Sequence, residues 1–140
     1  MLSPDLIRTF VLPGARQLVD QAKSYGFKVM HHSCGAVREI IPDLIGIGVD
    51  VIHPIQALAV GMEPQALKRD FGSRVSFCGG VDAQHLLVNG TPEEVAEQTR
   101  ELCALFPPGL VVSPSHEAIL PDTRPANIAA LFAAAGTDAS

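Results

Sequence analysis

The chain has 140 residues, of which 47% are hydrophobic and 18% are charged, and its formal net charge is −5. This composition excludes a disordered chain, and the acidic excess, with no Trp and a single Tyr, argues against a nucleic-acid partner. No apolar run reaches the roughly 18 residues of a membrane span, and the first residues lack the pattern of a signal peptide. Three cysteines, an odd number, argue against a disulfide framework. We therefore expect one globular domain in the cytoplasm, with no membrane partner.

Helical patterns recur along the chain, and their ends carry the usual helix signals. Ser3 followed by Pro4 predicts an N-cap and a first helical turn, and Pro13 predicts a bend in the same helix. Thr91 and Glu94 have the spacing of a capping box. The predicted helices span residues 4–24, 36–47, 63–70, 83–88, 92–106 and 125–135.

Four short runs rich in β-branched and aromatic residues lie between these helices and predict strands. Strands that alternate with single helices at this spacing are typical of βαβ units and a parallel sheet. The runs are continuously apolar, which predicts strands buried on both faces. They span residues 27–32, 49–53, 74–78 and 110–113.

An N-terminal helix followed by four βα units predicts an α/β fold of the TIM (β/α)8-barrel type, as a half-barrel of four parallel strands with crossover helices. A doubly wound sheet is the competing fold, but it ordinarily has a glycine-rich phosphate loop after its first strand, where Gly35 stands alone. We expect residues 1–136 to form the half-barrel and residues 137–140 to be a disordered tail. Because half a barrel leaves two open sheet edges, either the chain is a fragment of a longer gene or two copies close a barrel as a homodimer.

Groups able to do chemistry gather around the ends of the predicted strands. They are His31 to Gly35 after the first strand, Asp50, His53 and Gln56 around the second, Cys78 to Asp82 after the third, and Ser113 to Glu117 after the fourth. The carboxyl ends of parallel strands share one face of the sheet, and active sites of α/β folds lie there. We therefore expect a shared site at this face.

The pair His32-x-Cys34 is the sharpest local feature of the sequence. On an extended segment, residues i and i+2 point to the same side, so the imidazole and the thiolate can bind one metal ion, with zinc as the suspected metal. A third ligand must come from another strand end. His116 is the best candidate, and His53, Cys78 and Asp82 are the reserves.

The other strand-end residues have structural as well as functional interpretations. Asp82 either caps the short helix that follows it or takes part in the site. Gly79 and Gly80 either let the backbone approach a ligand or allow a tight turn. His53 either forms hydrogen bonds inside the barrel or contacts substrate. Gln56 is also a candidate for contact with substrate.

The order of several short motifs resembles the uroporphyrinogen decarboxylase superfamily, from Ser3 to about Ala134. The motifs are His32-Ser33-Cys34-Gly35, Gly48-Val49-Asp50-Val51, Pro54-Ile55-Gln56, Phe71-Gly72, Gly79-Gly80-Val81-Asp82, Gly90-Thr91-Pro92-Glu93-Glu94-Val95 and, near the end, Ser115-His116, Asp122, Pro125 and Asn127-Ile128. The resemblance implies a TIM barrel, of which this chain is similar to the C-terminal half.

The resemblance implies one of two chemistries acting on a small-molecule substrate. Members that transfer methyl groups use zinc to activate a thiol acceptor, coenzyme M in the best-known branch, and take the methyl group from a corrinoid carried by a partner protein. Their His-x-Cys pair is matched by His32 and Cys34, and their third ligand, a Cys, falls where this chain has His116. This reading makes His32, Cys34 and His116 the metal ligands, with Asp82 and Gln56 orienting substrate.

Two alternatives stay open. In a uroporphyrinogen decarboxylase, which removes acetate carboxyls from a tetrapyrrole without a cofactor, His116 would touch the substrate. The aspartate and arginines that bind the tetrapyrrole in that branch come from the N-terminal half, so no residue here can take those roles. The last alternative is a non-catalytic half-barrel.

The resemblance favours methyl transfer, because decarboxylation needs no thiolate. The candidate catalytic residues are therefore Asp82 and His116, and the candidate substrate-binding residues are Gln56, His53, Gly79 and Gly80.

Overall fold

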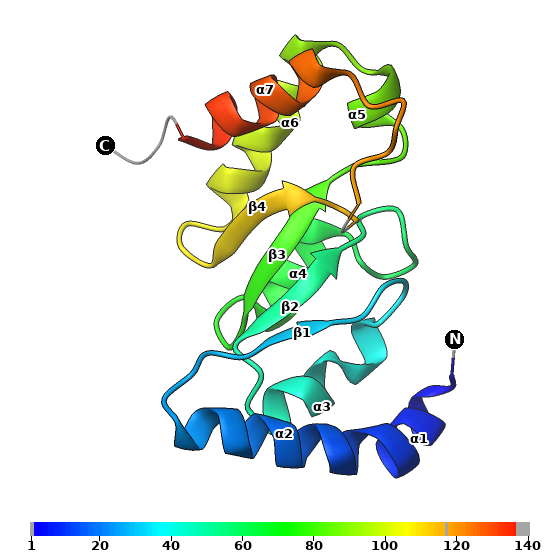
Figure 1. Cartoon of the computed structure of the whole chain (residues 1–140), viewed down its shortest axis with the longest axis vertical. Helices are drawn as coiled ribbons and strands as arrows, with labels where there is room; N and C mark the ends of the chain where they lie inside the picture. Colours follow the sequence, from blue (N-terminus) through cyan, green and yellow to red (C-terminus); the bar gives the residue numbers. More distant parts are fainter. Residues whose placement is uncertain (1, 117, 137–140) are drawn as a thin grey trace.

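A computed structural model of the chain describes residues 2–116 and 118–136, and its four strands form one parallel sheet. The strands follow one another across the sheet in chain order (Figure 1). They are β1 (Met30–His32), β2 (Val51–Ile55), β3 (Ser76–Val81) and β4 (Leu110–Pro114). The predicted α/β fold, with four parallel strands and crossover helices, is therefore confirmed. The tail predicted at residues 137–140 lies outside the described residues.

Helices fill the connections close to where the sequence predicts them. None of the helices formed by the described residues combines the length and apolar character that a membrane crossing requires. The helices are α1 (Pro4–Leu6), α2 (Leu12–Ser24), α3 (Ile41–Gly46), α4 (Pro64–Phe71), α5 (Leu86–Asn89), α6 (Pro92–Leu105) and α7 (Pro125–Gly136). The capping box of α6 is confirmed, since Thr91 Oγ1 accepts from the Glu94 N–H and Glu94 Oε2 accepts from the Thr91 N–H.

The irregularity predicted near Pro13 takes the form of a π-helical turn, Ile7–Val11, between α1 and α2. A proline ring clashes with the carbonyl one turn before it, and a wider turn at that place removes the clash. Pro42 likewise lies in the first turn of α3, after a 3₁₀ turn over Arg38–Ile40. Both prolines therefore begin helical segments, and neither interrupts a regular α-helix.

The helices cover one face of the sheet and leave the other face open. In Figure 1, α4 lies behind the strands. Ile52 and Phe77, paired in register on the covered face, are 1% and 0% exposed. On the opposite face Met30 of β1 and Val111 of β4 are 50% and 51% exposed. The prediction that the strands are buried on both faces is therefore wrong for the two edge strands, because the described helices pack against the other face of the sheet.

Asp50 lies at the amino ends of the strands, directly before β2, and not with the other candidate groups. Its carboxylate binds the Lys23 ammonium, accepts from the Val29 N–H at 2.7 Å and lies 3.5 Å from the Lys28 ammonium. The hydrogen bond from Lys23 and then that from Val29 lower the pKa of Asp50. A carboxylate with a lowered pKa stabilises the fold above its unfolded-state pKa, and this contribution disappears as the pH falls through the folded-state pKa. Asp50 therefore has a structural role.

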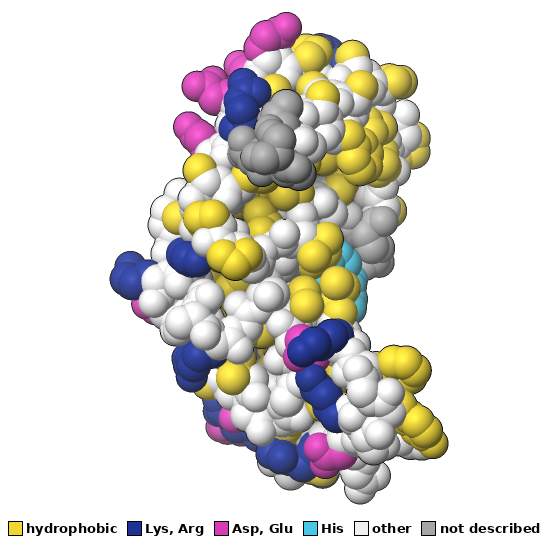
Figure 2. Space-filling view, turned by 90° about the vertical axis from the view of Figure 1, so that its left-hand side faces the viewer, with side chains coloured by type: hydrophobic (Ala, Val, Ile, Leu, Met, Phe, Trp, Pro, Cys, Tyr) yellow, Lys and Arg dark blue, Asp and Glu magenta, His cyan; other side chains and the backbone are white. Residues whose placement is uncertain are grey.

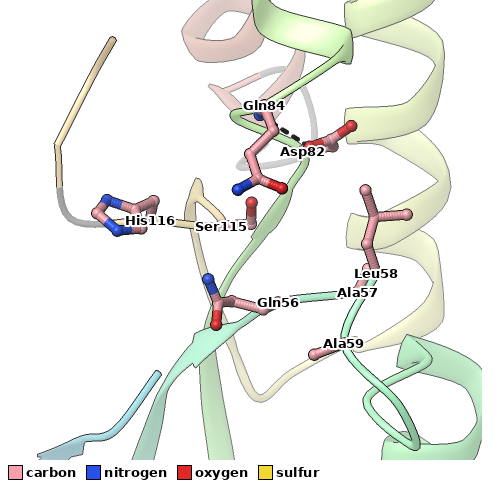
Figure 3. A pocket seen from close by; sticks show the side chains of 8 residues that line it. All are labelled: Gln56, Ala57, Leu58, Ala59, Asp82, Gln84, Ser115 and His116. Atoms are coloured by element: carbon pink, nitrogen blue, oxygen red, sulfur yellow. Dashed lines mark hydrogen bonds between the residues drawn. The ribbon is translucent and has the colours of Figure 1, made fainter. Parts of the chain in front are cut away.

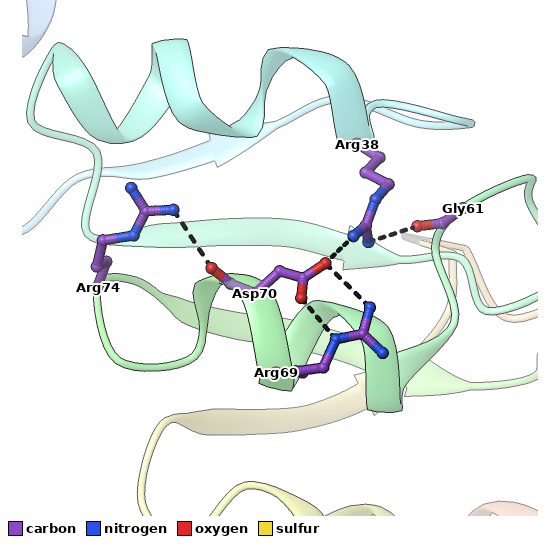
Figure 4. A network of polar contacts seen from close by, with 5 residues as sticks. All are labelled: Arg38, Gly61, Arg69, Asp70 and Arg74. Carbon is purple, nitrogen blue, oxygen red and sulfur yellow. Dashed lines mark hydrogen bonds and ion pairs between the residues drawn. The ribbon is translucent and has the colours of Figure 1, made fainter.

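An arginine network on the helix side fixes the loop after β2 (Figure 4). Arg38 binds the Asp70 carboxylate and donates to the Gly61 carbonyl at 3.2 Å. Arg69 donates to Asp70 at 2.7 and 3.2 Å, and Arg74 donates to the Asp70 backbone carbonyl at 3.3 Å. The hydrogen bonds from Arg69 and Arg38 lower the pKa of Asp70. The network joins the turn after β1 to α4 and to the loop that begins at Gln56.

Candidate functional site

His32 and His53 lie side by side at the carboxyl ends of β1 and β2. The two residues are partners in the parallel register, so their side chains point to the same face of the sheet. Their Nδ1 atoms are 2.8 Å apart, and their ring centroids are 4.8 Å apart. One imidazole donates to the other when one of these two Nδ1 atoms carries a hydrogen and the other does not. His31 alternates with them, and burial followed by the charge of His32 lowers the pKa of His31.

Cys34 approaches the other nitrogen of the His32 ring. Its Sγ lies 3.3 Å from His32 Nε2, and its side chain is exposed. Zinc binds imidazole nitrogen at about 2.0 Å and thiolate sulfur at about 2.3 Å. In tetrahedral coordination this nitrogen and this sulfur are therefore about 3.5 Å apart. The pair therefore has the chemistry and the separation that zinc requires of two of its ligands.

A complete ligand set is not gathered around this pair. Among residues 2–116 and 118–136, no three His, Cys, Asp or Glu side chains are grouped so that they could hold a metal ion. His116 is half-buried, and its Nδ1 accepts from the Ala118 N–H at 3.3 Å. Cys78 is buried, with its Sγ 3.6 Å from Ser113 Oγ. The third ligand stays a prediction.

Gln56, directly after β2, joins the His-x-Cys segment to a neighbouring pocket. Its Oε1 accepts from the Gly35 N–H, in the turn after Cys34. Gln56 also lines the pocket, together with Asp82 and His116 (Figure 3). The other lining residues are Ala57, Leu58, Ala59, Gln84 and Ser115. The two predicted catalytic residues and one predicted substrate-binding residue therefore share one pocket at the carboxyl ends of β2, β3 and β4.

Asp82 caps the turn before α5, as one of its two interpretations predicts. Its Oδ1 accepts from the Gln84 N–H at 2.9 Å, and its Oδ2 accepts from the Leu86 N–H at 3.2 Å. No role was predicted for the neighbouring Ser115, which is 7% exposed and whose Oγ accepts from the Ala83 N–H at 3.1 Å. Its signal in the sequence is its place among the polar groups at the end of the fourth strand. These contacts join the ends of β3 and β4 behind the pocket.

Gly79 and Gly80 permit close packing around β3. Both have positive φ angles, +111° and +101°. A Cβ on Gly79 would lie 2.7 Å from the Ile55 backbone nitrogen of β2, and one on Gly80 would lie 2.5 Å from Leu102 Cδ2 of α6. The glycines therefore let β2 and α6 approach β3, which is a structural reason for both, while contact with substrate stays a prediction.

Comparisons with known proteins place this arrangement in a family. The family model described as uroporphyrinogen decarboxylase (URO-D) matches residues 1–137. A methylated-thiol–coenzyme M methyltransferase of Methanosarcina mazei is 32% identical over 101 residues, which are 72% of this chain and 25% of that protein. A solved methyltransferase structure from Methanosarcina mazei matches with a TM-score of 0.77 and 24% identity, covering 96% of this chain and 37% of that one. The chain thus spans about a quarter to two fifths of the length of these relatives.

Proposed function

The chain belongs to the uroporphyrinogen decarboxylase family, as part of a TIM-type barrel, and we propose that it carries the zinc-binding part of a site for methyl transfer to a thiol. The observation that carries the proposal is the 3.3 Å separation of His32 Nε2 and Cys34 Sγ at the carboxyl end of β1. The printed name of the Methanosarcina mazei relative, a methylated-thiol–coenzyme M methyltransferase, supports the same chemistry.

In this proposal His32 and Cys34 hold zinc, and His116 on the loop after β4 is the third ligand. Bound zinc would lower the pKa of the acceptor thiol, so that a thiolate forms near neutral pH. The proton that the thiol loses would pass to solvent. The acceptor sulfur would take the methyl group from a corrinoid, which would keep the electron pair of the bond that it gives up. A partner protein would carry that corrinoid.

The pocket beside this pair would receive the small-molecule substrate. Gln56 and Asp82 offer amide and carboxylate groups from two strand ends, and His116 faces the same space from a third. Gly79 and Gly80 lie on β3, shortly before Asp82 in the chain. We propose that these residues orient the acceptor, with Asp82 and His116 nearest to the reacting groups.

The proposal is tested with purified protein reconstituted with Zn²⁺ and dialysed. We expect about one zinc per chain, and zinc-dependent methylation of coenzyme M with methylcobalamin as donor.

Decarboxylation is the second candidate, since the family model carries the name of a decarboxylase and Asp82 and His116 share a pocket that needs no metal. Consumption of uroporphyrinogen without zinc would support that candidate. Absence of both zinc and turnover would favour a non-catalytic half-barrel.

We also propose that two copies of the chain close one barrel. Among the described residues, β1 and β4 each pair with one strand only, and each exposes an apolar side chain on the open face, Met30 and Val111. Figure 2 shows hydrophobic side chains above and below a hollow on its right-hand side. A second copy would pair its β4 with β1 and its β1 with β4, which covers both edges.

Light scattering after size exclusion tests the closure. We expect twice the mass of one chain for the wild type and the mass of one chain for Val111→Lys, because a lysine at the β4 edge would enter the closed interior. Val60→Lys is the matched control, since Val60 is 84% exposed in the loop after β2. A folded wild-type monomer at micromolar concentration would contradict the proposal.

A further inference from the structure

We infer that the carboxyl end of β2 positions the two zinc-binding side chains of β1, with His53 orienting the His32 imidazole and Gln56 holding the turn after Cys34. This inference rests on the proposed zinc site, and it gives His53 and Gln56 roles other than contact with substrate. It follows from three contacts between the end of β2 and residues 32–35, two made by side chains and one by the backbone.

His53 contacts the nitrogen of His32 that faces away from Cys34. The two Nδ1 atoms are 2.8 Å apart, while Cys34 Sγ lies by Nε2. If Nε2 binds a metal ion, its lone pair must be free, so the hydrogen of the neutral ring must be on Nδ1. That Nδ1–H then donates to His53 Nδ1. With its own hydrogen on Nε2, His53 would favour the His32 tautomer that can bind the metal, and its position on the far side of the His32 ring makes it a positioning residue and not a ligand.

The backbone holds the same geometry. The Ser33 N–H donates to the His53 carbonyl at 2.9 Å, which continues the β1–β2 pairing beyond His32. Gln56 Oε1 then accepts from the Gly35 N–H. The residue between these two bonds is Cys34, so the turn that carries its thiol is fixed to β2 on both sides. Groups that orient a metal-ligating His in this way raise its affinity for the metal, because less freedom is lost on binding.

Three variants test the role of His53: His53→Ala, His53→Gln and, as a control, His85→Ala. Zinc affinity is measured by competition with a chelating dye, and Co²⁺ substitution gives the absorption spectrum of the site. We expect His53→Ala to weaken zinc binding by about 10- to 100-fold and to change the Co²⁺ spectrum. His53→Gln keeps an acceptor and should recover most of the affinity. His85 is exposed before α5, so its variant should match the wild type. Wild-type affinity in His53→Ala would overturn the inference.

A metal-free measurement separates this inference from the proposed function. Nitrogen-15 NMR of the imidazoles reports which ring nitrogen of His32 carries the hydrogen. We expect the tautomer of His32 with its hydrogen on Nδ1 to predominate in the wild type, and we expect the tautomer ratio to change in His53→Ala. If the wild type binds no zinc, the proposed function fails, and the NMR result still decides the role of His53. An unchanged ratio in His53→Ala would overturn it.

Discussion

Replacing His32 with alanine is expected to weaken zinc binding by about a hundredfold or more and to leave the fold intact. Structural zinc sites with four ligands bind with roughly 10–16 kcal/mol, which is about 3 kcal/mol per ligand. Each 1.4 kcal/mol is about a factor of ten in affinity. The His32 side chain is exposed on the open face, so its removal leaves no buried cavity. Zinc affinity by chelator competition and the thermal unfolding midpoint of the metal-free protein check the two parts of this prediction.

The neighbouring His31 supplies a control, because its replacement should change the stability of the protein and not its affinity for zinc. His31 is half-buried, and burial lowers its pKa. His31→Ala should therefore reduce the unfolding midpoint while zinc affinity stays close to that of the wild type. Cys34→Ser, which exchanges the thiolate for a poorer zinc ligand, should act like His32→Ala. If His32→Ala retains wild-type zinc affinity, the metal binds elsewhere and the proposed ligand pair is wrong.

The sequence was sufficient to predict the fold because its signals are local. The capping residues Ser3 and Thr91 and the apolar runs set the elements, and the spacing of the runs implies parallel pairing. Strand starts were less predictable. The first three predicted strands begin two or three residues early, since apolar side chains at Phe27 and Val49 do not require ladder pairing. Asp50, which was expected to lie with the candidate groups at the strand ends, lies directly before β2, at the amino ends of the strands.

The candidate site was predicted only as far as local geometry allows. The i, i+2 spacing correctly brought His32 and Cys34 together. The contact between His32 and His53 depends on the register of β1 on β2, which no local pattern specifies. The buried acceptor role of Ser115 likewise depends on how β4 lies against β3. Contacts between strands therefore account for most of what the sequence did not reveal.

Replacing Gly79 with alanine is expected to destabilise the protein by about 2–6 kcal/mol. A positive φ of +111° is strained for any residue with a Cβ, at a cost of roughly 1–3 kcal/mol. The new Cβ would also lie 2.7 Å from the Ile55 backbone nitrogen, which cannot rotate away as a side chain could. Overpacking of this kind adds about 1–3 kcal/mol. Urea denaturation of the variant measures the sum.

A second glycine separates the effect of this contact from the general effect of adding a methyl group. Gly14 lies in α2, and a Cβ there meets nothing within 4 Å. Gly14→Ala should therefore stabilise the protein by about 1 kcal/mol through helix propensity. Because Ile55 precedes Gln56, Gly79→Ala should also displace the end of β2 and weaken zinc binding at His32. Wild-type stability in Gly79→Ala would mean that β2 and β3 do not approach as closely as this packing requires.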